Sequence, residues 1–313
     1  MGRPLVNSEA VLYGTFINTA YAMFDANNAD LTPPVPAATG PAPMPGGWEM
    51  TAWIQMSDFA FGGGEHKRFY GFIARNVADP YSHILAIRGT EGAVEWYDDA
   101  VCVPRAFTPV PKAGNVASGF DDIYSTLQVV RCPREAVLGT LTPEAAATPQ
   151  TMTGTFADQI ESLLGTLPIT AAHTAAAGPN PKHNFVVTGH SLGGALTTLY
   201  TMEHAVKKKA DPTRKVVINV VCTFASPRVG TEAFVQAFDG LPIDSWRIAN
   251  AQDLVPKVPP SIALILPYQH VDTLYGFDSS GVVKFNPTCW HSMHTYLHWL
   301  DPNQTLDTAC RLT

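Results

Sequence analysis

Three histidines lie within twelve residues near the end of the chain, in the segment CWHSMHTYLHWL at 289–300. A histidine can act as a general base, bind a metal ion or simply pack in a core. His291, His294 and His298 are spaced by three and four residues, so a helix would place all three on one face. The helical zinc motif requires a glutamate directly after its first histidine, whereas Thr295 follows His294. We therefore predict no metal site and no other cofactor, and one of these histidines becomes a candidate base.

A candidate nucleophile lies in the segment VVTGHSLGGAL at 186–196, where Ser191 stands at the centre of a Gly-x-Ser-x-Gly pattern. The pattern alone is common, and a serine in a glycine-rich turn can be idle. Its context is more specific, because an apolar β-like run leads into it and a helical pattern leads out of it. This arrangement is the nucleophile elbow, which holds a serine oxygen at a helix N-terminus. It predicts acyl transfer by Ser191, with the backbone N–H of Leu192 as one donor to the oxyanion.

An acid is expected between the serine and the histidine, since that is the chain order of this type of triad. Asp253 closely follows the apolar run WRIAN at 246–250, and catalytic acids of this fold lie just beyond the carboxyl ends of strands. Asp244 precedes the same strand and is expected at the surface. Asp253 is therefore the predicted orienting acid.

The choice of base depends on where the last helix begins. Pro287 argues against helix in the crossing segment, and Ser292 is a suitable N-cap for a helix that runs to about Leu300. His291 then lies in the loop just before this helix, where a base could reach the serine. His294 lies one turn further along and remains the alternative. This reasoning predicts His291 as the base.

These residues need a framework that brings distant segments together, and the sequence alternates short β-like runs with longer helical patterns. Predicted strands cover 68–75, 83–89, 184–189, 215–226, 245–250 and 281–285. Predicted helices cover 8–26 (with Ser8 as N-cap), 118–130, 155–167 and 192–208, whereas 131–153 and 170–183 are predicted loops. The alternation predicts an α/β fold with a mainly parallel central sheet and helices on both faces. The nucleophile elbow favours the α/β-hydrolase type of this fold.

The composition favours one large folded domain over residues 1–313, in which a proline-rich connector at 31–47 follows the first helix. The net charge is −7, and the only tight basic run is Lys207–Lys209, so no nucleic-acid partner is expected. No apolar run is long enough to cross a bilayer, so no transmembrane segment is expected. The oligomeric state stays open.

Five cysteines are widely spaced and form no CxxC pair, which argues against a zinc ribbon or a redox motif. Cys222 lies in an apolar run and is expected to be a buried thiol. Two disulfides could form in an exported protein among Cys102, Cys132, Cys289 and Cys310, and their pairing stays open. The first ten residues do not read as a signal peptide, so a signal was removed or never existed. Secretion is favoured over a cytoplasmic location.

From about residue 48 to residue 300 the sequence resembles the class 3 lipases, the family of the fungal triacylglycerol lipases. Six blocks in the same order carry this resemblance: ILAIRGT at 84–90, ASGFDDIY at 117–124, VVTGHSLGGAL at 186–196, FASPRVGTEAF at 224–234, RIANAQDLVPKVPP at 247–260 and HSMHTYL at 291–297. The resemblance implies a serine esterase or lipase that hydrolyses carboxylic esters, with triacylglycerols as the expected substrate. It implies Ser191 as nucleophile, Asp253 as acid and His291 as base.

The resemblance also implies a second oxyanion donor, the backbone N–H of Thr90, with the threonine hydroxyl as a further contact. The glycine-rich segment FGGGE at 61–65 is the alternative, but it lacks a histidine and precedes a strand. The segment after Thr90 corresponds to the lid of related lipases and carries Val94, Trp96 and Tyr97. The apolar segment at 258–268 could line an acyl groove or pack in the core.

Three further functions remain open at this point. Phospholipase A1 and feruloyl esterase activities occur on the same framework, and the groove decides among them. A catalytically silent lipid-binding relative is the alternative of a different class, and the intact Ser191, Asp253 and His291 argue against it.

Overall fold

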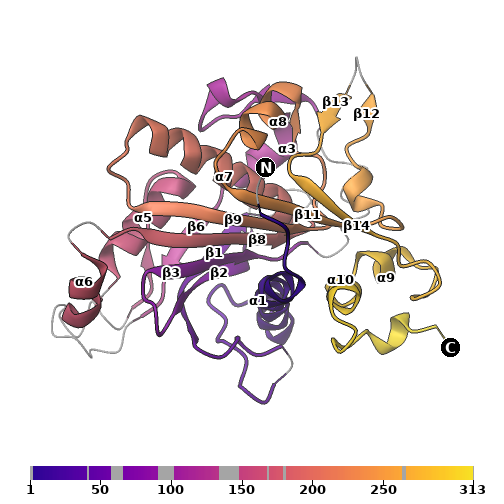
Figure 1. Ribbon diagram of the computed structural model, residues 1–313, viewed down its shortest axis with the longest axis horizontal. Coiled ribbons are helices and arrows are strands. Elements are labelled where there is room, and N and C mark those ends of the chain that lie inside the picture. The colour runs from indigo at the N-terminus through magenta and orange to yellow at the C-terminus, as the bar shows by residue number, and fades with distance from the viewer. Residues whose placement is uncertain are drawn as a thin grey trace.

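The computed structural model describes residues 3–40, 42–57, 66–90, 102–133, 148–167, 169–178, 181–262 and 266–312. Within these ranges, a nine-stranded sheet crosses the molecule (Figure 1). Its strands, in spatial order, are β14 (Thr273–Phe277), β11 (Asp244–Asn250), β9 (Val216–Phe224), β8 (His183–His190), β3 (Ser82–Ile87), β2 (Lys67–Asn76), β1 (Trp48–Ser57), β6 (Gln128–Arg131) and β7 (Gln150–Thr151). Neighbouring strands run parallel from β14 to β3 and antiparallel from β3 to β7.

Helices cover both faces of this sheet. In Figure 1, α1 (Asn7–Ala26) and α10 (Met293–Leu300) lie below the sheet, whereas α3 (Ser118–Tyr124), α5 (Phe156–Thr166), α7 (Leu192–Ala210) and α8 (Glu232–Asp239) lie above it. Each face has its own hydrophobic cluster, and β3 shows the division. Leu85 and Ile87 pack into the upper cluster, while Ile84 and Ala86 pack into the lower one. Strands buried on both faces in this way read as continuous apolar runs.

The remaining elements are short. Strands β4 (Pro104–Ala106), β5 (Asn115–Ala117), β10 (Gly230–Thr231), β13 (Leu266–Gln269) and β12 (Ser261–Ile262) form a small sheet beside the main one. The short helices are α6 (Ala171–Ala177), α9 (Pro287–His291) and the 3-10 turns η2 (Pro111–Ala113), η3 (Val255–Lys257) and η4 (Thr308–Cys310). Among the described residues, no helix has both the length and the apolar character needed to cross a bilayer.

The predicted α/β-hydrolase architecture is confirmed, with helices on both faces and parallel strands from β14 to the central strand β3. The predicted strands at 68–75, 83–89, 184–189, 215–226 and 245–250 correspond to β2, β3, β8, β9 and β11, and the helices at 8–26, 155–167 and 192–208 to α1, α5 and α7. The antiparallel pairing of the strands from β3 to β7 was not predicted.

Several local predictions are wrong. The segment 281–285 is not a strand, since Val283 makes a single bridge to Arg311 and Phe285 is 91% exposed. The predicted helix 118–130 ends at Tyr124, because the β-branched residues that follow pair with β1 as strand β6. The first helix begins at Asn7, so Ser8 lies inside it and is not the N-cap.

Two short helices also lie where none was predicted. Pro287 is the first residue of α9, where its missing N–H costs nothing, and the Asn286 side chain caps this helix by accepting the N–H of Thr288. The predicted loop 170–183 contains the alanine-rich helix α6, whose N-cap Thr170 accepts the N–H of His173.

Candidate active site

Ser191 lies at the sharp turn between β8 and α7. Its backbone has φ 57° and ψ −126°, a conformation that L-residues rarely adopt outside constrained turns. The turn is anchored by its neighbours, because the Ser191 N–H donates to the Phe224 carbonyl at 2.9 Å and the Ser191 carbonyl accepts from the Gly194 N–H at 2.9 Å. The sheet and the helix together therefore hold the serine in this strained geometry.

The two outer glycines of the Gly-x-Ser-x-Gly pattern are required by close packing. A Cβ at Gly189 would lie 2.3 Å from the carbonyl oxygen of Gly193. A Cβ at Gly193 would lie 2.2 Å from the carbonyl oxygen of Ile87 on β3. The strand, the helix and the neighbouring strand thus meet too closely for any side chain, as the elbow interpretation predicts.

Asp253 follows the end of β11 and is 1% exposed. Its Oδ2 accepts hydrogen bonds from His291 Nδ1 at 2.8 Å and from the Tyr296 hydroxyl at 2.7 Å. Its Oδ1 accepts from the backbone N–H of Val255 at 2.9 Å. A buried carboxylate is stable only when it is paired in this way, and the three donors fix its orientation.

His291 is the last residue of α9 and directly precedes Ser292, the N-cap of α10. The carboxylate of Asp253 can only accept, so in the neutral imidazole of His291 the proton is on Nδ1 and Nε2 is left with a lone pair. Nε2 and the hydroxyl oxygen of Ser191 are both buried and make no hydrogen bond within the described residues. The arrangement therefore offers a basic nitrogen and a hydroxyl that other side chains do not occupy.

His190, the residue before the nucleophile, joins these parts. Its Nε2 donates to the main-chain carbonyl of His291 at 2.9 Å, and its Nδ1 accepts from the Tyr21 hydroxyl at 2.8 Å. The same hydroxyl accepts the Gly89 N–H at 2.8 Å. Burial lowers the pKa of His190 well below its usual range, and the neighbouring His291 acts in the same direction. The lowered pKa favours neutral His190, and the neutral ring fits this hydrogen-bond pattern.

The candidate oxyanion donors belong to two segments next to the serine. Leu192 begins α7, where the first backbone N–H groups have no partner within the helix. Thr90 follows the end of β3 and is 8% exposed. A Cβ placed on Gly89 would lie 2.8 Å from the Cβ of Ser191, so the turn that leads into Thr90 passes directly beside the nucleophile.

Asn250 connects the acid turn to the helix that carries His291. Its side-chain amide donates to the Trp290 carbonyl at 2.9 Å and to the Ser279 hydroxyl at 2.8 Å. Its side-chain oxygen accepts the backbone N–H groups of Gln252 and Ser279. This one buried side chain therefore fixes the loop before Asp253 against the residue before His291.

The other histidines of the terminal segment bind elsewhere. His294 Nδ1 contacts the carboxylate of Asp307 at 2.7 Å, and His298 Nδ1 donates to the Gln304 carbonyl at 2.8 Å. Within the described residues, no group of three or more His, Cys, Asp or Glu side chains is arranged to hold a metal ion. The candidate lid residues Val94, Trp96 and Tyr97, and the segment 61–65, lie outside the described residues.

Reasoning from the sequence missed Tyr21, His190, Asn250 and Tyr296. His190 and Asn250 lie inside blocks that were recognised, at GHSLG and RIANAQD, and their position beside the candidate triad was the available signal. Tyr21 lies on the first helix, and nothing in its local pattern distinguishes it from a core residue.

The sequence profile of the family described as Lipase (class 3) matches residues 84–262, which is more than half of the chain. The chain belongs to the class 3 lipase family. Phospholipase A1-II 3 of Oryza sativa subsp. indica is 28% identical over 231 residues, a match that covers 69% of this chain and 47% of that protein. Secreted mono- and diacylglycerol lipase 1 of Fusarium solani is 34% identical over 116 residues, covering 37% of this chain and 32% of that protein. The chain thus spans about a third to a half of these two relatives.

The solved structures agree on the fold. Lipase II from Rhizopus niveus superposes with a TM-score of 0.55 at 19% identity, covering 87% of this chain and 80% of that one. The Rhizomucor miehei lipase propeptide complex superposes with a TM-score of 0.54 at 19% identity, covering 86% of this chain and 67% of that one. At this level of identity the likeness shows a shared architecture.

Proposed function

We propose that this class 3 lipase family member is a serine hydrolase of carboxylic esters in lipids. One observation carries the proposal. The imidazole of His291 is bonded through Nδ1 to the buried Asp253, while its Nε2 and the hydroxyl of Ser191 make no hydrogen bond within the described residues. A base that is oriented on one side and open on the other is what nucleophilic catalysis by serine requires.

The reaction would proceed through an acyl-enzyme. Nε2 of His291 takes the proton of Ser191 as the serine oxygen attacks the ester carbonyl. The backbone N–H groups of Leu192 and Thr90 bind the oxyanion of the tetrahedral intermediate. His291 returns the proton to the leaving alcohol, and a water molecule then repeats the sequence to release the acid. Asp253 holds the imidazole in the required tautomer and stabilises the imidazolium that forms.

We propose acylglycerols, and triacylglycerols in particular, as the substrate. The match to a mono- and diacylglycerol lipase supports this class, and the fold shared with a fungal lipase is compatible with it. A phospholipase A1 activity is the second candidate. It is favoured by the matches to phospholipase A1-II proteins, one of which covers 69% of this chain. A feruloyl-type esterase is the remaining alternative on this framework.

A lid is also proposed for the segment after Thr90, on the residues Val94, Trp96 and Tyr97. Its amphipathic composition would let it cover the site in water and open at a lipid surface. Activity should then rise sharply when a short-chain triglyceride exceeds its solubility limit. A flat dependence across that limit would contradict a lid.

The test compares the wild type with Ser191→Ala on p-nitrophenyl esters of increasing chain length, a triglyceride and phosphatidylcholine. Ser125→Ala is a matched control, because that exposed hydroxyl donates only to the Asp122 carbonyl in α3. We expect the wild type and the control to hydrolyse at least one substrate and Ser191→Ala to lose at least about a thousandfold in kcat. A fluorophosphonate probe should label the wild type and not Ser191→Ala. A folded wild type that takes no label would instead support a silent lipid-binding protein.

A further inference from the structure

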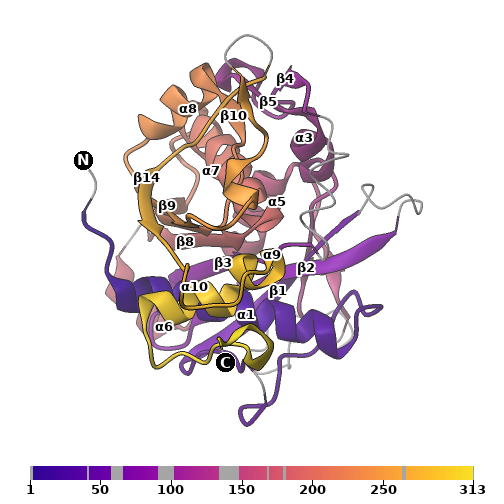
Figure 2. The same ribbon diagram turned by 90° about the vertical axis from the view of Figure 1, so that its right-hand side faces the viewer.

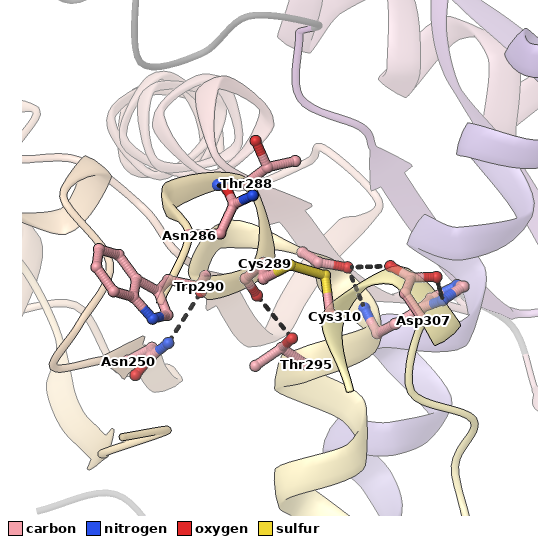
Figure 3. Close-up of a disulfide and its surroundings, with 10 residues drawn as sticks. Asn250, Asn286, Thr288, Cys289, Trp290, Thr295, Asp307 and Cys310 are labelled. Atoms are coloured by element: carbon pink, nitrogen blue, oxygen red, sulfur yellow. Dashed lines mark hydrogen bonds and ion pairs between the residues drawn. A yellow bond between two sulfur atoms is a disulfide. The ribbon is translucent and has the colours of Figure 1, made fainter. Parts of the chain in front are cut away.

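The chain after α10 turns back toward α9, and we name residues 301–312 the C-terminal strap. In Figures 1 and 2 the yellow C-terminal end stays next to α9 and α10. Figure 3 shows the covalent attachment, a disulfide between Cys289 and Cys310 that lies close to Trp290 and Asp307. Cys289 belongs to α9 and lies two residues before His291. Cys310, and with it the strap, is thus covalently attached to the helix that carries the proposed base.

Polar contacts attach the strap on the other side of His291. Asp307 accepts a hydrogen bond from the Ser292 hydroxyl at 2.9 Å, and its second oxygen contacts His294 Nδ1 at 2.7 Å. Ser292 is the residue after His291 and the N-cap of α10. His298 adds a third contact, from its Nδ1 to the Gln304 carbonyl at 2.8 Å. His294 and His298 therefore have a definite role, which is to hold the strap.

The strap packs against α9 and Val283 in a small hydrophobic cluster. Its members are Val283, Cys289, Trp290, Leu306 and Cys310, and they are separate from the two clusters that cover the sheet. The strap is further held by the Lys284 N–H, which donates to the Cys310 carbonyl at 2.9 Å. Loosening the strap should therefore leave the packing of the central sheet unchanged.

Helix α9 depends on such neighbours for its position. It has five residues, which is far too short for a helix that is stable by itself. Beyond the disulfide, its main chain is held by Asn250 on the Trp290 carbonyl, His190 on the His291 carbonyl and the Thr295 hydroxyl on the Cys289 carbonyl. Two of the five positions from Cys289 to Met293 thus bond directly to the strap, and they flank His291.

We propose that the C-terminal strap positions the catalytic base, with Asp307 and the Cys289–Cys310 disulfide as its positioning residues. This inference rests on the proposed function of His291. Nε2 must come within about 2.6–3.2 Å of the serine hydroxyl to take its proton, while Nδ1 keeps its bond to Asp253. A misplacement of about 1 Å can cost about a hundredfold in rate. The strap acts on the residues before and after His291, and so it limits both the shift and the tilt of the ring.

The experiment uses the full chain and three variants: Asp307→Ala, Asp307→Asn and the double variant Cys289→Ser/Cys310→Ser. Asp301→Asn is the matched control, because that carboxylate lies in the same strap and binds only Asn303 and Gln304. Kinetics with a soluble p-nitrophenyl ester give kcat and KM separately. A fluorophosphonate then gives two further quantities, the rate of Ser191 labelling and the fraction of molecules finally labelled.

For Asp307→Ala and for the double variant we expect kcat to fall by about tenfold or more, with KM changed less than about twofold. Labelling should slow in proportion and still reach the same final fraction as the wild type. Asp307→Asn keeps one acceptor oxygen and should recover part of the loss, and Asp301→Asn should match the wild type. A merely structural role would lower the final labelled fraction instead of the rate.

The proposal is overturned if kcat and the labelling rate of all three variants equal those of the wild type. It is equally overturned if activity falls only in proportion to the labelled fraction. Should the double variant fail to fold, the two Asp307 variants still decide, since both retain the disulfide. If the wild type is active and the variants are unaffected, only the role of the strap is refuted. If a folded wild type is never labelled, the proposed function itself is refuted.

Discussion

The side chain of His190 is hydrogen-bonded to the main chain of His291, with 2.9 Å between Nε2 and the carbonyl oxygen. The two imidazole rings also pack together, with centroids 4.5 Å apart. The residue that precedes the proposed nucleophile therefore contacts the proposed base directly. A shift of β8 relative to α9 would break this contact, so the pair ties the positions of Ser191 and His291 to each other.

The hydroxyl of Tyr21 should support the site. In Tyr21→Phe the His190 Nδ1 loses its donor and the Gly89 N–H loses its acceptor, while the ring stays in place. We expect kcat to fall by about three- to tenfold, and the free energy of unfolding to fall by about 1 kcal/mol. Steady-state kinetics and urea unfolding measure the two effects. Tyr275→Phe is the control, since its hydroxyl makes only an exposed bond to Asn7. Equal kcat in both variants would show that the network is irrelevant to turnover.

The backbone of Ser191 should carry a measurable stability cost. Glycine tolerates its φ of 57°, so Ser191→Gly should raise the free energy of unfolding by about 1 kcal/mol while removing activity. Ser191→Ala removes the same hydroxyl but keeps the Cβ, and should gain less. Chemical unfolding of both variants beside the wild type gives the comparison. If the alanine variant is the more stable of the two, the strain is not located in the backbone.

Two buried histidines at the far end of β3 and β8 should make the protein sensitive to acid. His83 Nε2 and His183 Nδ1 are 2.9 Å apart. Burial lowers the pKa of His83 to about 3, assisted by His183 and Arg75. Burial also lowers the pKa of His183 to about 4. Unfolded histidines bind a proton near pH 6.5, so the unfolded state takes up more protons as the pH falls below that value.

The free energy of unfolding should therefore keep its full value above pH 6.5 and decline below it. The expected loss between pH 7 and pH 5 is about 2 kcal/mol for His83 alone. Urea unfolding at several pH values measures the slope. His83→Gln should reduce this slope, and His66→Gln should not, since His66 is exposed on the same part of the chain. A slope that is identical in wild type and His83→Gln would refute the assignment.

The disulfide should stabilise one region selectively. Its sequence separation is 21 residues, and closing a loop of this size contributes about 3 kcal/mol in the loop-entropy treatment. In Cys289→Ser/Cys310→Ser, the amides of α9 and the strap should exchange with solvent faster, while those of β8 and β9 keep their protection. Hydrogen exchange read by mass spectrometry resolves these segments. Cys132→Ser, which alters a free thiol, is the control. Uniform loss of protection across the sheet would mean that the strap cluster is not independent.

The nucleophile and the acid could be proposed from the sequence because their signals are local. Ser191 lies between a strand and a helix that can both be predicted from the sequence, and Asp253 closely follows a strand. Asp253 could be chosen over Asp244 because Asp253 follows the predicted strand, whereas Asp244 precedes it. The choice of His291 over His294 used the helix boundary at Ser292, and the structure does place that N-cap at Ser292.

What could not be predicted depends on contacts between segments far apart in the sequence. Tyr21 and His190 are 169 positions apart, and no periodicity links them. Strand β6 was predicted as helix because its residues suit both forms, and pairing with β1 decides in favour of strand. The roles of His294 and His298 depend on the strap, and no pattern in residues 301–312 predicts the path that the strap takes.

The order of the chain along the site has a consequence for synthesis. Tyr21, Gly89 and Ser191 leave the ribosome well before His291, and Cys310 follows it by another nineteen positions. All strands of the main sheet also precede His291 in the sequence, so the residues that form the sheet and the elbow are synthesised before the base and the strap. The proposed base, however, acquires its covalent support only when Cys310 is exposed and oxidised. The segment that fixes the base is thus synthesised after the other parts of the site, and full competence to cleave esters should appear only once Cys310 has been synthesised and oxidised.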